Sequence, residues 1–280
     1  MALQISPPLE TSSRSARLFS VESIDIHKHG DFFSPIVVLD DFRVSSRPFP
    51  PHPHVGFSAV TYVFEDSTGG LHSSDSLGND IRVGPGGIVW AQAGRGLIHH
   101  EVPAQPDREL HGAQFFVNLS ARNKLITPQV LWLDGKDVRE WNNNHGDRVR
   151  VVVGRYNGVE SPLYPVEPFT LLDADIRTML EFEVLPEQYG LLYIYSGNAQ
   201  VIACHKEAPL TAGQAISLRG KGVFRIAANQ AVRVLYLAGN EYHDPVAASG
   251  PFIMNDVSQI HDAIKRFDAG EMGQLEPIAK

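Results

Sequence analysis

The chain has 280 residues, 43% hydrophobic and 20% charged, so it can bury one large core or two smaller ones. Its formal net charge is −8, and its basic residues are scattered apart from a weak cluster at Arg219, Lys221 and Arg225, which argues against direct nucleic-acid binding. Cys204 is its single cysteine and no stretch of about 18 apolar residues occurs, so we expect no intrachain disulfide and no membrane span. We expect a cytoplasmic protein, also nuclear if the source is eukaryotic.

Short β-strands separated by turn residues account for most of the chain. Each candidate strand is rich in β-branched and aromatic residues and is bounded by Gly, Pro, Asn or Asp. The candidates are residues 57–64, 87–93, 112–119, 148–154, 190–197 and 232–239. Because no helical pattern separates them, the sequence predicts an all-β sandwich or barrel.

One amphipathic helix is predicted near the end of the chain. Val257, Ile260, Ile264 and Phe267 recur at helical spacing. Asn255 and Asp256 are candidate N-caps, and Gly270 stands where a helix would end. We interpret the apolar stripe as ordinary packing.

An internal repeat indicates duplication. A single offset of 126 residues superimposes glycines 87, 94 and 96 on glycines 213, 220 and 222, and Tyr62-Val-Phe resembles Tyr193-Ile-Tyr. We therefore predict two similar antiparallel β-barrels, residues 1–135 and 136–245, followed by a helical tail at 246–280. The offset places His99 on Arg225 and Glu101 on Ala227, so these polar residues of the first copy are not required by the fold.

Two motifs in the first half could bind a metal: Pro51-His52-Pro53-His54 and His99-His100-Glu101. Because side chains alternate along a strand, His52 and His54 share a face, as do His99 and Glu101, while His100 points the other way. Three imidazoles and one carboxylate suit Fe, Mn, Ni, Cu or Zn better than calcium. The alternative is that each motif is a solvated loop or strand end.

Other histidines carry weaker signals. We interpret His27 and His29 as part of a solvated turn, His72 as exposed in a polar hairpin, and His111 as a strand cap. The chain has no dinucleotide fingerprint or P-loop, and no serine or cysteine in the setting of a hydrolase nucleophile.

At these motifs the sequence resembles the pirin family of the cupin superfamily. The resemblance rests on PHPH followed by Gly56-Phe57, on Asp75-Ser-Leu-Gly-Asn79, Pro85-Gly86 and Trp90, and on Ala93-Gly-Arg-Gly96 leading to His99 and Glu101. It continues at His111-Gly-Ala-Gln114, Val117-Asn-Leu119 and Gly250-Pro-Phe-Ile-Met-Asn255. The sequence departs from many pirins at Val55 and Ser58, where they carry Arg and Glu.

The resemblance implies a bicupin with one metal, usually iron and here expected as Fe(II), in the N-terminal barrel. By motif its ligands are His52, His54, His99 and Glu101, and the second barrel has no metal site. It also suggests quercetin 2,3-dioxygenase-like activity, with a flavonol and dioxygen as substrates and Glu101 as general base. Candidate pocket residues are Phe57, Trp90, Gln114 and Phe115 or Phe116.

The sequence is also compatible with two other functions. Some pirins act as transcriptional cofactors or bind metabolic enzymes, so the chain could be a metal- or redox-dependent regulatory protein with a protein partner and no turnover. Alternatively, it could be a metal-free scaffold in which the histidines are vestigial.

Overall fold

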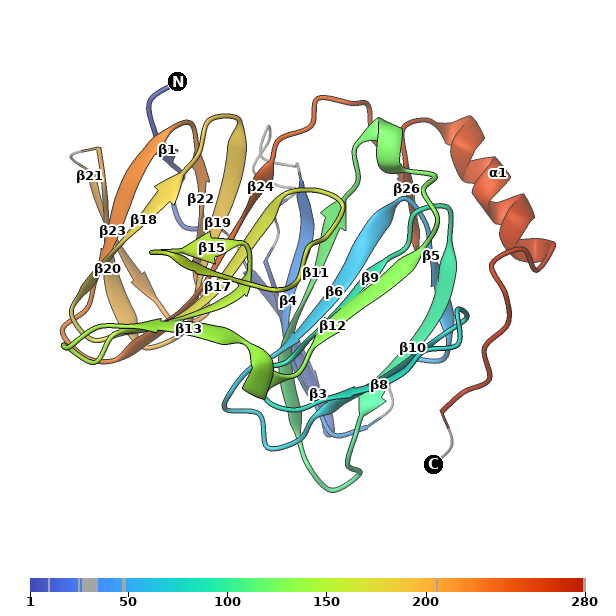
Figure 1. Cartoon of the computed structure of the whole chain (residues 1–280), viewed down its shortest axis with the longest axis horizontal. Coiled ribbons are helices and arrows are strands. Elements are labelled where there is room, and N and C mark those ends of the chain that lie inside the picture. Colours follow the sequence, from blue (N-terminus) through green and yellow to red (C-terminus); the bar gives the residue numbers. More distant parts are fainter. Residues whose placement is uncertain (10, 25, 27–34, 47–48, 205, 279–280) are drawn as a thin grey trace. The chain divides into compact units, whose positions relative to one another are not determined.

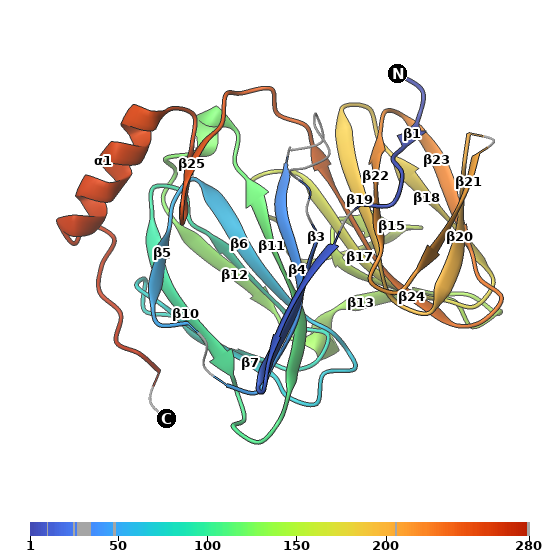
Figure 2. The same cartoon turned by 180° about the vertical axis from the view of Figure 1, so that it is seen from behind.

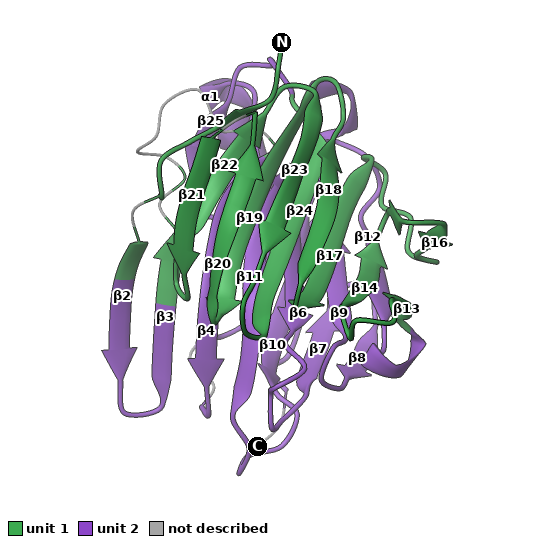
Figure 3. Cartoon of the chain, turned by 90° about the vertical axis from the view of Figure 1, so that its left-hand side faces the viewer, with its two compact units in different colours: residues 1–12, 22–35, 138–241 green, residues 13–21, 36–137, 242–280 purple. Residues whose placement is uncertain are grey.

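The computed structural model describes the chain except residues 10, 25, 27–34, 47–48, 205 and 279–280, so His27 and His29 lie outside the described residues. The chain forms two compact units (Figure 3). Unit 2 comprises residues 13–21, 36–137 and 242–280, and unit 1 comprises residues 1–12, 22–35 and 138–241. The domain boundaries predicted at residues 135 and 245 remain a prediction, because compact units are not by themselves independently folding domains.

Unit 2 is built mainly on two antiparallel sheets (Figure 1). The larger has the order β12-β9-β6-β11-β4-β3-β2: Gln129–Leu133, Ile88–Gln92, Phe57–Val63, Leu110–Asn118, Ile36–Val44, Phe19–Ile24 and Thr11–Ala16, of which residues 22–24 and 11–12 are assigned to unit 1. The smaller has the order β5-β10-β7-β8: His52–His54, Leu97–Pro103, Leu71–Asp75 and Asp80–Val83. One buried apolar cluster contains Val63 and Val89 of the first sheet with Leu71 and Val83 of the second, so the sheets form a sandwich.

Unit 1 repeats this architecture. Its larger sheet has the order β1-β22-β19-β24-β17-β14-β13: Gln4–Ile5, Ala215–Arg219, Gln188–Ser196, Val232–Asn240, Phe169–Ile176, Arg148–Val153 and Arg139–Asn142. Its smaller sheet has the order β18-β23-β20-β21: Met179–Val184, Gly222–Ala227, Asn198–Ala203 and Lys206–Thr211. Each strand from β17 to β24 thus occupies the position that β4 to β11 occupy in unit 2, which confirms the duplication.

The remaining elements are short, apart from one helix. They are β15 (Arg155–Tyr156), β16 (Val159–Glu160), β25 (Ala247–Ser249), β26 (Phe252–Met254), the 3-10 turns Ala121–Asn123 and Gly135–Asp137, and α1 (Val257–Asp268) (Figures 1 and 2). The predicted helix is confirmed: the Asp256 side chain accepts a hydrogen bond from the Gln259 backbone N–H, and Ile260 is buried. No helix among the described residues has the length and apolar character needed to span a bilayer.

All six predicted strands are present, but the glycine offset assigns the wrong residue to His99. β9 and β22 begin at Ile88 and Ala215, whereas β10 and β23 begin at Leu97 and Gly222, so the strands are offset by 127 and 125 residues instead of 126. An error of one residue reverses the face. Arg225 is therefore half-exposed and ion-paired with Glu181, while Phe224 beside it points into the core.

Candidate metal centre

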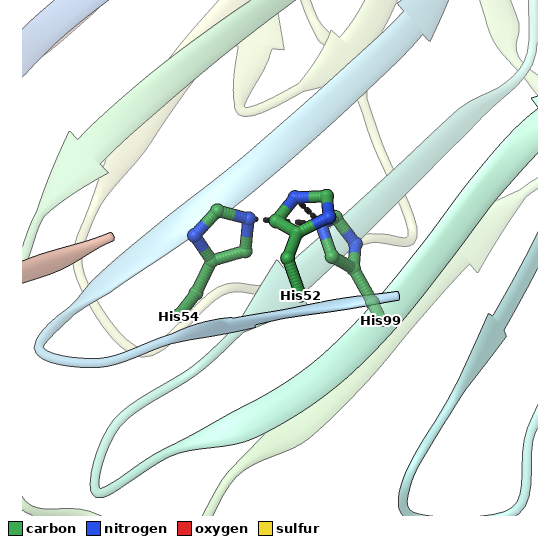
Figure 4. Close-up of side chains that lie close together, drawn as sticks. All are labelled: His52, His54 and His99. Carbon is green, nitrogen blue, oxygen red and sulfur yellow. Dashed lines mark hydrogen bonds between the residues drawn. The ribbon is translucent and has the colours of Figure 1, made fainter. Parts of the chain in front are cut away.

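Three histidines from two neighbouring strands converge in unit 2. In the antiparallel register of β5 and β10, Leu97 lies opposite His54 and His99 opposite His52. Figure 4 shows the three rings pointing toward one another. The Nε2 atom of His99 lies 2.8 Å from Nε2 of His54 and 3.2 Å from Nε2 of His52. Across the described residues, this is the one group of three His, Cys, Asp or Glu side chains whose ligand atoms lie within 4.8 Å of one another.

Burial keeps two of these imidazoles neutral. His54 is 3% exposed and His99 1%. Burial, reinforced by the neighbouring histidines, lowers the pKa of His99 to about 3 and also lowers the pKa of His54 well below its ordinary value. A neutral imidazole can direct an unprotonated nitrogen at a cation.

The Nδ1 atom of His52 lies 2.9 Å from the Pro50 carbonyl oxygen. If Nδ1–H donates to that carbonyl, Nε2 becomes the lone-pair nitrogen, which is the usual outer hydrogen bond of a metal-binding histidine. At metal–nitrogen bond lengths of about 2.1 Å, two cis ligands in an octahedron lie about 3.0 Å apart. The two observed Nε2 separations fall on either side of that value, so the three histidines fit a transition-metal ion.

Glu101 faces the same interior but lies outside the group of three. Its Oε2 accepts a hydrogen bond from Thr61 Oγ1 on β6 at 2.6 Å, and its Oε1 is 4.0 Å from His99 Nδ1. Burial raises the pKa of Glu101 to about 7, although hydrogen bonds from Thr61 and Ser73 act in the opposite direction. Glu101 therefore lies on the face that strand alternation predicts, with its carboxylate beside His99.

Two predicted pocket aromatics line the histidine cluster. The ring centroid of His54 is 5.0 Å from that of Phe57 and 5.5 Å from that of Phe116. Gln114 lies opposite Thr61 in the β6–β11 ladder, so its side chain projects from the same face as Thr61, toward the smaller sheet. These three residues share the interior with the candidate ligands.

Trp90 does not lie at the cluster. It is opposite Val60, one residue out of phase with Thr61, and its ring packs against Phe115 on the other face of the sheet at a centroid separation of 6.2 Å. Of Phe115 and Phe116, Phe116 is the one whose ring approaches His54, while Phe115 packs on Trp90. Ser58 also lies on this outer face, since it alternates with Phe57, whereas Val55 packs against Phe252.

Three further histidines are buried, although His72 was predicted to be exposed. His100 does face away from the cluster, but the chain near the C-terminus covers it: the Ile278 backbone N–H donates to His100 Nδ1 at 3.0 Å. His72 is 8% exposed and contacts Asp80. His111 is the second residue of β11 and contacts two carboxylates, Asp66 at 2.6 Å and Asp41 at 3.0 Å, so it is a buried pairing residue and no strand cap.

Sequence reasoning missed the support of β5. β5 is an edge strand, and beyond its end Val55 forms an isolated parallel bridge with Phe252 of β26. The buried Lys124 ammonium donates to the Gly56 and Ile253 carbonyls, each at 2.9 Å, and to the Asn118 side chain. In the sequence, the one indication of this support was the motif Gly250-Pro-Phe-Ile-Met-Asn255, which contains the β26 residues that contact Val55 and Lys124.

Two copies of one two-sheet module, with a three-histidine cluster in one copy, define a bicupin protein with a candidate metal centre. The family model for Pirin matches residues 14–117, and the model for the Pirin C-terminal cupin domain matches residues 171–273. The chain belongs to the pirin family.

Curated relatives span most of the chain. A protein of Pseudomonas aeruginosa named "Putative quercetin 2,3-dioxygenase" is 32% identical over 253 residues, which cover 85% of this chain and 86% of that protein. Rat pirin is 30% identical over 251 residues, which cover 85% of this chain and 82% of rat pirin.

Two solved structures share the fold. Quercetin 2,3-dioxygenase from Acinetobacter baumannii matches 99% of this chain and 100% of its own, with a TM-score of 0.84 at 22% identity. The bacterial pirin YhhW from Escherichia coli, solved with nickel(II), matches 85% of this chain and 99% of its own, with a TM-score of 0.66 at 16% identity.

Proposed function

We propose that this protein is a metal-dependent dioxygenase that cleaves flavonols such as quercetin. The observation that carries the proposal is the convergence of three Nε2 atoms from His52, His54 and His99 beside a buried carboxylate and two aromatic rings. The names of the Pseudomonas aeruginosa relative and the Acinetobacter baumannii structure supply the substrate class. Membership of the pirin family supports the metal.

In this proposal His52, His54 and His99 hold one divalent ion, with Fe(II) as the first expectation and Mn, Ni, Cu or Zn as alternatives. When bound, the ion supplies Lewis-acid stabilisation of an oxygen on the substrate. Glu101 is two residues from His99 on the same face of β10 and would be the fourth ligand in this proposal.

Glu101 would also accept the proton of the flavonol 3-hydroxyl. Burial raises its pKa to about 7, which is close to the working pH and suits a general base. Thr61 would hold one carboxylate oxygen and leave the other for the proton. The resulting enolate is electron-rich enough to react with dioxygen, after which the ring opens and carbon monoxide leaves.

Phe57 and Phe116 would form one wall for the flat substrate, and Gln114 could donate a hydrogen bond to one of its oxygens. The rings of Phe57 and Phe116 contact each other with a centroid separation of 4.6 Å. An apolar wall of this kind excludes water from the enolate, so the proton on Glu101 would return to a product oxygen instead of exchanging with solvent.

The decisive experiment follows quercetin absorbance under air and under argon with protein of known metal content. We expect oxygen-dependent bleaching, carbon monoxide release and about one metal ion per chain, all lost in His99→Ala. Arg225→Ala is the control, because that residue lies half-exposed on the other copy of the module and is no candidate ligand. Stoichiometric metal with no turnover on any flavonol would reject the enzyme and favour the regulatory alternative.

A further inference from the structure

Lys124 carries a buried ammonium that the proposed function does not use. Its side chain is 1% exposed, although lysines are almost never fully buried unless their charge is partnered. The Nζ atom donates to the carbonyl oxygens of Gly56 and Ile253, each at 2.9 Å, and to the side-chain oxygen of Asn118. Because an ammonium has three N–H donors and no acceptor, its whole hydrogen-bonding capacity is used.

Two of the three acceptors belong to the backbone that follows His54. Gly56 is two residues after His54, where β5 turns into β6. Ile253 belongs to β26, and its backbone N–H donates to the Val55 carbonyl at 3.0 Å. Because the Lys124 ammonium binds the Gly56 and Ile253 carbonyls at once, it closes the link between β26 and the strand that ends at His54.

The third acceptor lies beside the aromatic rings that pack on His54. Asn118 is opposite Phe57 in the β6–β11 ladder and two residues after Phe116 on β11. The ring centroids of Phe57 and Phe116 are 5.0 and 5.5 Å from that of His54. The hydrogen bond to Asn118 thus anchors the end of the ladder that carries both aromatic neighbours of His54.

The chemistry of the Lys124 contacts suits positioning better than stabilisation of the fold. All three acceptors are neutral, two backbone carbonyls and one amide, so the buried charge gains no ion pair from them. Apolar side chains of similar volume often stabilise a core as well as buried charges do, or better. Directed N–H bonds, in contrast, fix the three oxygens relative to one another, because a fully satisfied polar network is rigid.

We propose that Lys124 is a positioning residue of the metal centre, which fixes the direction of the His54 ring through its three acceptors. The inference rests on the metal site of the proposed function and is independent of the substrate. Because the Nε2 atoms of His54 and His99 lie 2.8 Å apart, a displaced or mobile His54 changes the geometry that the pair offers to an ion. Metal sites require ligands that are held in place before the ion binds.

Cobalt(II) binding to the whole protein tests this role without turnover, because the visible spectrum of bound cobalt(II) reports the geometry of its ligands. Lys124→Met should weaken the cobalt(II) affinity at least about tenfold and alter the spectrum, since loss of residues that orient metal-binding histidines typically has effects of this size. His111→Ala is the matched control, because it breaks a buried pairing with Asp41 and Asp66 in the same unit. It should lower stability and leave the affinity and the spectrum unchanged.

Chemical rescue separates the ammonium from the volume of the side chain. Propylammonium has the carbons and the nitrogen that Lys124→Ala removes. It should therefore restore the cobalt(II) affinity and spectrum of that variant, whereas propan-1-ol should restore neither. If neither lysine variant folds, Asn118→Ala carries the test, because it removes one acceptor and keeps the ammonium, and it should weaken cobalt(II) binding several-fold.

Unchanged cobalt(II) affinity in Lys124→Met, or equal losses in Lys124→Met and His111→Ala, would overturn the inference. Equal rescue by propylammonium and propan-1-ol would overturn it too, because volume alone would then explain the effect. Weaker cobalt(II) binding in Lys124→Met, in a protein whose wild type cleaves no flavonol, would support the role of Lys124 and reject the dioxygenase.

Discussion

The Nε2 atoms of His54 and His99 face each other at 2.8 Å inside unit 2, on two strands whose register places Leu97 and not His99 opposite His54. The contact is therefore diagonal across the ladder, and both rings are buried and neutral. At most one proton can lie between the Nε2 atoms of His54 and His99. Because the Nε2 atom of His52 also lies beside them, at least one of the three nitrogens keeps a lone pair that no hydrogen occupies. A cation would satisfy all three.

The first prediction follows from that geometry. A divalent metal at 100 times its Kd should raise the free energy of unfolding by about 2.7 kcal/mol, because it binds the folded state alone. His99→Ala should abolish this gain, whereas Arg225→Ala should keep it. Thermal unfolding with and without added metal measures the effect, and an equal gain in His99→Ala would show that the metal binds elsewhere.

The second prediction concerns pH. Burial lowers the pKa of Lys124 to about 7 from its ordinary value of 10.5. Between these values the unfolded chain binds a proton at Lys124 that the folded chain does not, so the free energy of unfolding should rise with pH across this window. Below pH 7 Lys124 is protonated in both the folded and the unfolded state, so it no longer makes the free energy of unfolding depend on pH.

Lys124→Met removes this titration. The difference in unfolding free energy between the wild type and Lys124→Met should therefore shift in favour of the wild type as pH rises from about 7 to 10. Lys136→Met, at an exposed position, serves as the control and should show no such trend. A difference that is flat over this range would mean that Lys124 keeps its proton in the folded state.

The third prediction concerns Gly56, which follows the second histidine by two residues. Its φ is +83°, and an added Cβ would lie 2.0 Å from the Ile253 carbonyl oxygen. Gly56→Ala should lower the free energy of unfolding by about 3 kcal/mol or more, since it adds both backbone strain and a clash with β26. Gly78→Ala is the matched control, because that glycine also has a positive φ but open space around it. Similar losses in both variants would assign the cost to φ alone.

The fourth prediction concerns His111 and its two carboxylates. Breaking a buried pairing of this kind costs about 3 kcal/mol, somewhat less here because Asp66 is 41% exposed. His111→Ala should therefore lower the free energy of unfolding by about 2–3 kcal/mol. His145→Ala, at an exposed position, should stay within about 0.5 kcal/mol of the wild type. An unchanged free energy of unfolding in His111→Ala would mean that Asp41 and Asp66 find other partners at no cost.

Local patterns in the sequence predicted the strands, the helix and the face of each candidate ligand. Alternation placed His52 with His54 and Glu101 with His99, because the period of a strand is fixed by its backbone. Alternation could not tell the inner face from the outer face, which is why Trp90 seemed as suitable a pocket residue as Phe57.

Features that depend on contacts between distant segments were not accessible in this way. The exposure of His72 and the strand-cap role of His111 were predicted wrongly because their carboxylate partners lie on other strands or loops. The offset of 126 failed at Arg225 because the glycines mark turns, and the turn between β22 and β23 is shorter than that between β9 and β10. The burial of Lys124 has no sequence signature, since its three oxygen partners come from three separate segments.

The placement of β26 has a consequence for biosynthesis. Within the described part of the chain, the edge strand that carries His52 and His54 gains its second neighbour from residues 251–253, through the Val55 bridge and the hydrogen bond from Ile253 to Val55. A nascent chain on the ribosome would expose these histidines long before that neighbour is translated. If His52, His54 and His99 hold a metal ion as proposed, its binding would follow docking of the last segment, and a ribosome stalled before residue 251 would hold a chain with all three histidines but without the second neighbour of their edge strand.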